Sequence, residues 1–191
     1  MPTTKIANGA KRPPERPARV NKRRTLFQGP QFSFVTESVK LPNGHAVELS
    51  FVDHPGSTAV VPLLDAKHVL LLRQYRHPVG AYLYEIPAGT LEPGESFEEC
   101  ARRELIEETG YAANEMVLLA KTHILPAYSN ELIHVFLATS LEKSVQALDA
   151  EEVIEVVPFE FKAAMDIIEQ GRMTDALSIL ALYRADRYLH L

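Results

Sequence analysis

The stretch GTLEPGESFEECARRELIEETGY, residues 89–111, decides how the rest of the chain is interpreted. Its second half predicts a helix over Ser96–Thr109, and Gly110 is the residue expected to end it. On a wheel of 3.6 residues per turn, one face of this helix turns toward the core. That face carries Phe97, Ala101 and Leu105.

Three carboxylates crowd the last turn of this helix. Glu104 and Glu108 are one turn apart and fall on the core side, while Glu107 lies at the edge of that side. The helix dipole disfavours negative charge at this end, and like charges four residues apart repel. A fold tolerates this arrangement where a cation is bound. Carboxylate oxygens are preferred ligands of hard divalent ions, so the stretch predicts a metal site.

Length and composition favour an ordinary globular protein. The chain has 191 residues, of which 46% are apolar and 24% charged, enough for one medium-sized domain with a small appendage. Cys100 is the sole cysteine, so we expect a reducing compartment and no intramolecular disulfide. No apolar run is long enough for a membrane span. We therefore expect a cytoplasmic protein with no membrane partner.

Charge is distributed unevenly along the chain. Residues 1–24 carry a net charge of +7, so the remainder carries −12. An acidic body is a poor binder of the nucleic-acid backbone, and we do not expect nucleic acid as the partner. Residues 1–24 also contain four prolines, three of them close together at 13, 14 and 17, and lack hydrophobic periodicity, which predicts a flexible basic arm. Contact of this arm with a polyanion or an acidic subunit stays open.

The remaining pattern predicts an α+β fold with a small N-terminal sheet. Residues 25–57 form the predicted antiparallel sheet subdomain, in which Asn43-Gly44 joins two β-like runs, and residues 58–191 form the main domain. The order of elements in the main domain suggests an α/β/α sandwich around a mixed sheet. We expect its strands at 58–64, 68–75, 82–86, 116–124, 132–139 and 153–159, and two further helices at 162–170 and 175–188.

The central stretch resembles the Nudix box. Gly89, Glu95, the run Arg103-Glu104-Leu105-x-Glu107-Glu108 and the pair Gly110-Tyr111 match that motif at all nine specified positions. Agreement at nine positions is far more specific than a lone glycine-rich pattern. The resemblance implies the Nudix fold and hydrolysis of nucleoside diphosphates linked to another group.

The resemblance also implies roles for individual residues. Metal ligands would be the carboxylates of Glu104, Glu107 and Glu108 and the backbone carbonyl of Ala88, holding two or three Mg²⁺ ions, with Mn²⁺ as a substitute. Arg103 and Glu107 would belong to the catalytic machinery, with Arg103 placed four residues before Glu107 for an orienting ion pair. Glu95 is expected to brace the preceding loop.

Flanking segments resemble the ADP-ribose pyrophosphatase group. Arg73-Gln74-Tyr75-Arg76 and the run Glu85-Ile86-Pro87-Ala88-Gly89 match two of its segments, which implies that Arg76 and Glu85 bind substrate. The loop 126–131 resembles a further segment, although Ala127 stands where that group has glycine. Glu131 in this loop is the candidate general base, and a box carboxylate is the alternative.

The sequence leaves several hypotheses about the function open. The leading one is Mg²⁺-dependent hydrolysis of ADP-ribose or a related nucleotide sugar to a nucleoside monophosphate and a sugar phosphate. GDP-mannose, FAD or a dinucleoside polyphosphate are alternative substrates, and a non-catalytic domain that senses ADP-ribose is a different class. In the resembled group the N-terminal sheet is exchanged between subunits, which implies a homodimer formed through this sheet.

Overall fold

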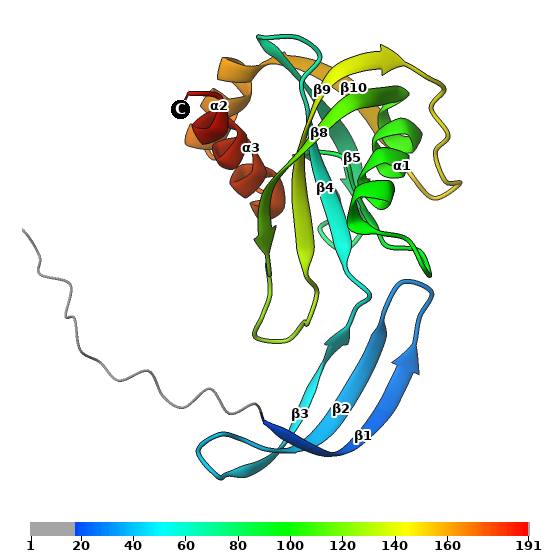
Figure 1. The fold of residues 1–191 in the computed structure, drawn as a ribbon, viewed down its shortest axis with the longest axis vertical. Coiled ribbons are helices and arrows are strands. Elements are labelled where there is room, and N and C mark those ends of the chain that lie inside the picture. The colour runs from blue at the N-terminus through cyan, green and yellow to red at the C-terminus, as the bar shows by residue number, and fades with distance from the viewer. Residues whose placement is uncertain (1–17, 191) are drawn as a thin grey trace, which may run out of the picture. The chain divides into compact units, whose positions relative to one another are not determined.

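The computed structural model describes residues 18–190, which form two compact units that divide between Asp53 and His54 (Figure 1). The smaller unit is one antiparallel sheet of three strands in the order β1-β2-β3. These strands are β1 (Arg19–Gln28), β2 (Ser33–Lys40) and β3 (Ala46–Asp53). The predicted Asn43-Gly44 turn joins β2 to β3, with Gly44 at φ 90°.

The structure corrects two predicted boundaries in this region. Residues 19–24, which the sequence analysis placed in a flexible arm, lie in β1 and pair with β2. All of β1 is exposed, so it shows no buried periodicity that would distinguish it from an arm. His54 and Ser57 make their hydrogen bonds within the larger unit rather than within the N-terminal sheet. Residues 1–17 of the predicted arm lie outside the described residues.

The larger unit contains two sheets. One has four strands in the order β7-β4-β9-β8, with β4 and β9 parallel and the other pairs antiparallel. The other has three antiparallel strands in the order β10-β5-β6. The strands are β4 (Ser57–Pro62), β5 (His68–Arg76), β6 (Ala81–Glu85), β7 (Ala88–Thr90), β8 (Tyr111–Thr122), β9 (Ile133–Lys143) and β10 (Ile154–Glu160).

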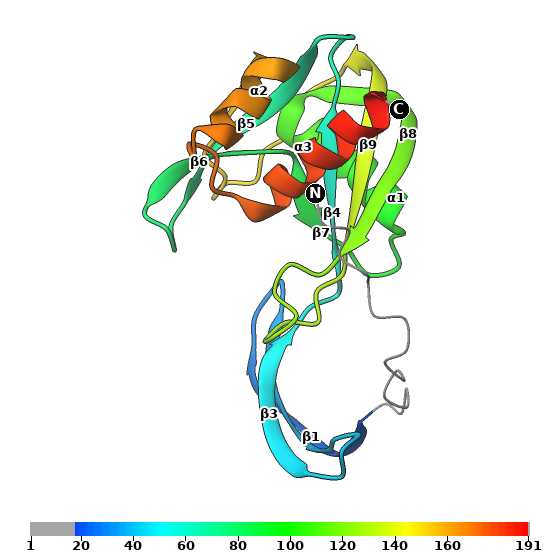
Figure 2. The ribbon, with the colours of Figure 1, turned by 90° about the vertical axis from the view of Figure 1, so that its left-hand side faces the viewer.

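Two of the three helices in residues 18–190 cover the faces of the four-stranded sheet, while the other packs against β5, β10 and a neighbouring helix. The helices are α1 (Phe97–Thr109), α2 (Phe161–Glu169) and α3 (Ala176–Leu189). Figures 1 and 2 show α1 on one side of β4 and β9 and α3 on the other. The alternation along β4 accounts for this arrangement, since Val60 packs in the cluster of α1 while Ala59 and Val61 pack in the cluster of α3. The predicted α/β/α sandwich around a mixed sheet is confirmed.

Helix α1 has well-formed ends. Ser96 and Glu99 form a capping box, in which each side chain accepts a hydrogen bond from the other residue's backbone N–H. Gly110 ends the helix in the left-handed conformation, at φ 72°. The loop after β9 then satisfies the last carbonyls, because Gln146 Nε2 donates to the Glu108 carbonyl and Ala147 N to the Glu107 carbonyl. The C-terminal turn that carries the carboxylates is therefore fixed.

Strand β7, like β1, was not predicted from the sequence. Residues 88–90, which were expected to be only a stop after the preceding strand, form β7 and pair with β4. Pro87 ends the β5–β6 ladder, and its carbonyl accepts a hydrogen bond from Val60 N at 2.8 Å. This places Ala88 and Gly89 directly beside α1. Within residues 18–190, no helix is long and apolar enough to cross a membrane.

Candidate active site

The site begins with two buried carboxylates on α1. Glu104 is 9% exposed and Glu108 is 2% exposed, and they lie on the same side of the helix as Ala101 and Leu105, which are fully buried. The side chain of Glu107 is 38% exposed. The sequence predicts this arrangement, with two carboxylates on the core side and the third at its edge, and the structure confirms it.

Both buried carboxylates sit in surroundings that disfavour their charge. Burial raises the pKa of Glu108 well above its ordinary value, and the nearby charge of Glu104 raises it further. The backbone N–H of Ala88, which donates to Glu108 Oε2 at 2.9 Å, opposes this effect. Burial likewise raises the pKa of Glu104, against the opposing charge of Arg103. A cation placed between these carboxylates would be strongly favoured.

Arg103 forms hydrogen bonds both with the loop before α1 and with carboxylates of α1. Its guanidinium forms two hydrogen bonds with Glu95, at 2.9 and 3.0 Å, and one with Glu104 at 2.7 Å. The predicted ion pair with Glu107 is present at 3.0 Å. The bonds from Arg103 lower the pKa of Glu95 to about 2, so Glu95 is ionised at neutral pH. Glu95 also accepts from Glu92 N, which braces the loop as expected.

Gly89 provides the space in which Glu104 lies. A Cβ atom at this position would come within 1.9 Å of the Glu104 carboxylate, well inside van der Waals contact. Glycine is therefore required by close approach here rather than by a left-handed backbone conformation. The fixed glycine of the motif has a direct physical explanation.

The donor set around these residues fits a hard divalent ion. It consists of carboxylate oxygens with raised pKa values and the backbone of a strand that approaches within contact of Glu104. In the part of the chain that the structure describes, no three His, Cys, Asp or Glu side chains converge as a complete cage. Mg²⁺ usually takes one or two carboxylates and completes its shell with water and substrate phosphate, so a full protein cage is not required.

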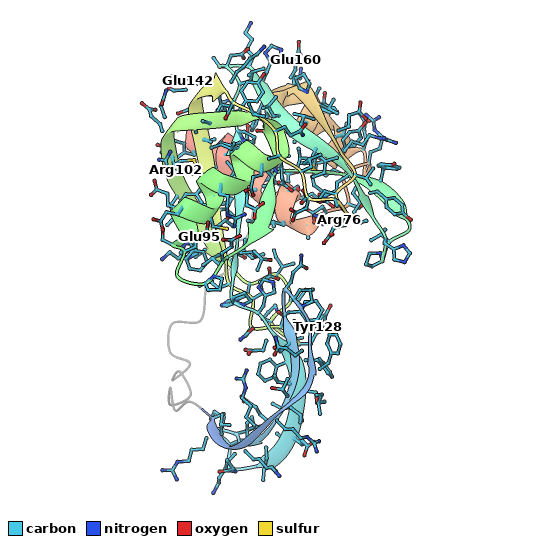
Figure 3. All side chains as sticks on the ribbon, turned by 90° about the vertical axis from the view of Figure 1, so that its right-hand side faces the viewer. Arg76, Glu95, Arg102, Tyr128, Glu142 and Glu160 are labelled. Atoms are coloured by element: carbon cyan, nitrogen blue, oxygen red, sulfur yellow. The ribbon has the colours of Figure 1, made fainter. Side chains whose placement is uncertain are left out.

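Arg76 and Glu85, the predicted substrate-binding residues, are brought together across the β5–β6 hairpin. Arg76 Nε and Nη2 donate to both Glu85 oxygens at 2.7–3.1 Å. Burial works against the Arg76 charge, but the bonds to Glu85 outweigh it and raise the pKa of Arg76. Both side chains line a cavity of about 340 Å³ together with Ala88 and Asp175. Figure 3 shows Arg76 on β5 and Glu95 in the loop before α1.

Glu131, the candidate base, lies in different surroundings. Ser57 Oγ donates to Glu131 Oε1 at 2.5 Å, and His54 Nδ1 lies 3.8 Å from the same oxygen. Thr58 Oγ1 bonds Cys100 of α1, so the alternation of β4 turns Ser57 to the opposite face. Among the described residues, none of the hydrogen bonds or ion pairs joins Glu131 to the carboxylates of α1. The role of Glu131 therefore stays a prediction.

Glu152 is an acidic residue to which the sequence analysis assigned no role. It precedes β10, and its carboxylate accepts a hydrogen bond from Asp149 N at 2.9 Å. Burial is the main cause of the raised pKa of both Glu104 and Glu108. The charge of Glu152 is a smaller cause that raises the pKa of each. The acidic run 149–152 was visible in the sequence, but its distance along the chain from α1 hid this proximity.

The family assignment follows from the match over the whole site. Residues 53–177 match the model of the NUDIX domain, and this range covers every site residue described above. This chain belongs to the Nudix family. Nudix hydrolases depend on divalent metal ions, in agreement with the donor set on α1 and β7.

The chain is similar to Nudix relatives that are named for different activities. The chain is 36% identical over 159 residues to a protein named ADP-ribose pyrophosphatase from Bacillus subtilis, covering 82% of this chain and 86% of that one. It is 33% identical, with the same coverage, to a methanol dehydrogenase activator from Bacillus methanolicus. A crystal structure of an ADP compounds hydrolase superposes with a TM-score of 0.78 at 24% identity, covering 92% of this chain and 95% of that one. That structural likeness supports the fold alone.

Proposed function

We propose that this Nudix hydrolase cleaves the pyrophosphate bond of ADP-ribose or a related nucleotide sugar, giving a nucleoside monophosphate and a sugar phosphate. The observation that carries the proposal is the pairing of two buried carboxylates on one face of α1, Glu104 and Glu108. A cavity containing Arg76 adjoins them through Ala88, whose N–H bonds Glu108. The name of the B. subtilis relative supports ADP-ribose as the first substrate to test.

The metal-binding part of the proposal assigns ligands on two elements. Glu104, Glu107 and Glu108 of α1 and the Ala88 carbonyl of β7 would hold two or three Mg²⁺ ions, with Mn²⁺ as a substitute. Bound Mg²⁺ would neutralise the pyrophosphate and activate the attacking water. Arg103 orients Glu104 and Glu107 from one guanidinium nitrogen, at 2.7 and 3.0 Å. Its role is therefore in positioning these carboxylates.

Arg76 is the proposed anchor for the pyrophosphate. Its guanidinium remains a cation, and its side chain is 43% exposed beside the cavity, which leaves it accessible to an anion. The Glu85 side chain is only 7% exposed and holds Arg76 by a bidentate ion pair. A structural ion pair alone would account for the same geometry. Replacement of Arg76 by Ala distinguishes an anchor for substrate from a purely structural ion pair. An anchor role requires a raised KM for every pyrophosphate substrate.

The general base has more than one candidate, and a carboxylate of the Nudix box stays one of them. Glu131 is the candidate from the sequence, and its position on a loop would allow it to close over bound substrate. Glu152 is favoured by a specific observation, since its charge acts on both buried carboxylates of α1. We therefore propose Glu152 and Glu131 as competing candidates, with a carboxylate of the Nudix box as the alternative to both.

A substrate panel tests the proposed activity. ADP-ribose, GDP-mannose, NADH, FAD and diadenosine polyphosphates are each assayed with Mg²⁺, and kcat/KM is compared. We expect ADP-ribose or another nucleotide sugar to give the highest value. A higher value for FAD or a dinucleoside polyphosphate would assign the chain to a different Nudix activity. Tight binding of ADP-ribose with no turnover of any compound would favour the sensing domain.

The N-terminal sheet supports a separate proposal, that the protein is a cytoplasmic homodimer joined through this unit. Large apolar side chains are exposed on its three strands and the β1–β2 connection, namely Val20, Leu26, Phe27, Phe32, Phe34 and Leu49. Such a concentration of exposed apolar surface is typical of an interface. Sedimentation velocity tests this directly. We expect a dimer for the full chain and a shift toward monomer after Phe34→Glu.

A further inference from the structure

In the segment that connects β6 to β7, each backbone N–H group donates a hydrogen bond to a side chain. The segment runs from Glu85, the last residue of β6, through Ile86 and Pro87 to Ala88. Since Pro87 has no N–H, the connection itself offers only the N–H groups of Ile86 and Ala88. Ala88 N donates to Glu108, as described above, while Ile86 N donates to Ser178 Oγ at 2.9 Å. The second bond crosses 92 residues of sequence.

Ser178 in turn donates a hydrogen bond to the carboxylate of Asp175. Its side chain is fully buried, and its Oγ donates to Asp175 Oδ2 at 2.6 Å. The Ile86 amide can only donate, so Ser178 Oγ accepts from it and uses its own O–H to donate to Asp175. Asp175 also caps α3, accepting from Ser178 N at 2.8 Å. A directional chain thus leads from Ile86 through Ser178 to Asp175.

Asp175 itself lies at the proposed substrate cavity. It lines the 340 Å³ cavity with Arg76, Glu85 and Ala88. Its charge is one of the causes that raise the pKa of Arg76. The hydrogen-bond chain therefore begins in the segment that carries Glu85 and Ala88 and ends at a carboxylate facing the same cavity. An ordinary helix cap would make no contact with this segment.

We propose that Ser178 and Asp175 are positioning residues for the active site, an inference that rests on the proposed pyrophosphate hydrolysis. They fix Ile86 so that Glu85 stays paired with Arg76 on one side and Ala88 stays bonded to Glu108 on the other. Loss of the Ser178 hydroxyl leaves a buried amide without an acceptor, which favours displacement of the segment. The consequence reaches the substrate anchor and the metal-binding strand together.

The test uses Ser178→Ala in the full chain, with Ser178→Thr as the conservative variant that keeps the hydroxyl. A second pair, Asp175→Ala and Asp175→Asn, removes or retains an acceptor at the other end of the chain. Asp65→Ala is the matched control, because Asp65 also accepts backbone N–H bonds, from Lys67 and His68, but at a turn that does not line the cavity.

Two measurements separate positioning from simple stability. Amide hydrogen exchange of Ile86 and Ala88 reports the segment directly and requires no substrate. We expect Ser178→Ala and Asp175→Ala to speed exchange of Ile86 at least tenfold, and Ser178→Thr and Asp175→Asn to restore protection. The variants that lose protection should also lose at least tenfold in kcat/KM for ADP-ribose, at a temperature well below every Tm.

The outcomes are distinct. Unchanged Ile86 exchange in Ser178→Ala would overturn the proposal, and so would a loss of kcat/KM no larger than that of an equally destabilised Asp65→Ala. If the wild-type chain hydrolysed nothing in the substrate panel, the proposed function would fail. The exchange of Ile86 would still decide whether Ser178 holds the segment.

Discussion

The backbone N–H of Ala88 donates to Glu108 Oε2 at 2.9 Å, and this bond ties strand β7 to the last turn of helix α1. It gives a carboxylate that is 2% exposed one fixed donor. The strand that provides this donor also brings Gly89 against Glu104. Strand and helix together therefore hold both buried carboxylates in place before any substrate binds, which is the preorganisation that electrostatic catalysis requires.

Gly89→Ala should leave the fold intact while damaging the site. The added Cβ would lie 1.9 Å from the Glu104 carboxylate, which is the far end of a flexible side chain and can move away. We expect kcat to fall by more than about tenfold, roughly 1.4 kcal/mol of transition-state stabilisation, with a two-state unfolding transition retained. Steady-state kinetics and circular dichroism measure both effects.

Gly94→Ala is the control for that variant. Gly94 has φ 86°, so alanine there is strained, but nothing lies within 4 Å of the added Cβ. It should lower stability by about 1 kcal/mol and leave kcat near the wild-type value. Equal kinetic losses at the two glycines would mean that loop strain, rather than the position of Glu104, limits activity.

Glu108→Gln should fold normally and lose nearly all turnover. The amide keeps the size of the side chain and an oxygen that can accept from Ala88 N, but it removes a negative charge from a buried pair. We expect kcat to fall by at least about a hundredfold, since a metal ligand contributes several kcal/mol to the transition state. Tm should stay the same or rise, because burial of like charges is relieved.

Glu98→Gln provides the comparison on the same helix. Its carboxylate is 55% exposed and pairs with Arg102 on the solvent side of α1, so it should alter kcat by less than twofold. Mn²⁺ binding measured by electron paramagnetic resonance gives a reading independent of turnover. Wild-type Mn²⁺ affinity and activity in Glu108→Gln would disprove the assignment of Glu108 as a ligand.

Features encoded by neighbours in sequence were predictable. The start of α1 at Ser96, its end at Gly110 and the inward side of Glu104 and Glu108 all depend on residues within four positions of one another. Strand β1 was missed because its ten residues are all exposed and leave no hydrophobic pattern. Amphipathic periodicity reports only the elements that bury one face.

Features set by strand pairing could not be predicted from spacing alone. Arg76 and Glu85 are nine residues apart and meet because β5 and β6 form a hairpin of a particular register. The bond between Ser57 and Glu131 crosses 74 residues and depends on the parallel pairing of β4 with β9. The spacing of Asp175 and Ser178 did carry a signal, since it is the spacing of a helix cap.

A pair of variants decides between the two candidate bases. If Glu152 is the base, Glu152→Gln should lower kcat by at least about a hundredfold, the size of a general-base contribution. Glu131→Gln should lower kcat by less than that, because its carboxylate bonds Ser57. Single-turnover kinetics with ADP-ribose isolates the chemical step. The reverse order of the two effects would return the role of base to Glu131.

The pH dependence of stability should contain a contribution from His134. This residue of β9 is 9% exposed and stacks on Phe97, with ring centroids 3.6 Å apart. Burial lowers the pKa of His134, and the charge of Lys121 on the paired strand lowers it further. The unfolded chain therefore takes up a proton before the folded one as the pH falls. The contribution of His134 is constant above its ordinary pKa of about 6.5 and is lost progressively below it.

Urea unfolding of His134→Gln at pH 7.5 and pH 5.0 measures this contribution. The variant should be less stable at pH 7.5, because the stacking on Phe97 is lost, but it should lose less stability than the wild type between the two pH values. Lys121→Gln keeps the imidazole and removes the second cause of its lowered pKa, so it should give an intermediate loss. If His134→Gln lost as much stability as the wild type over this range, protonation of His134 would not be linked to folding.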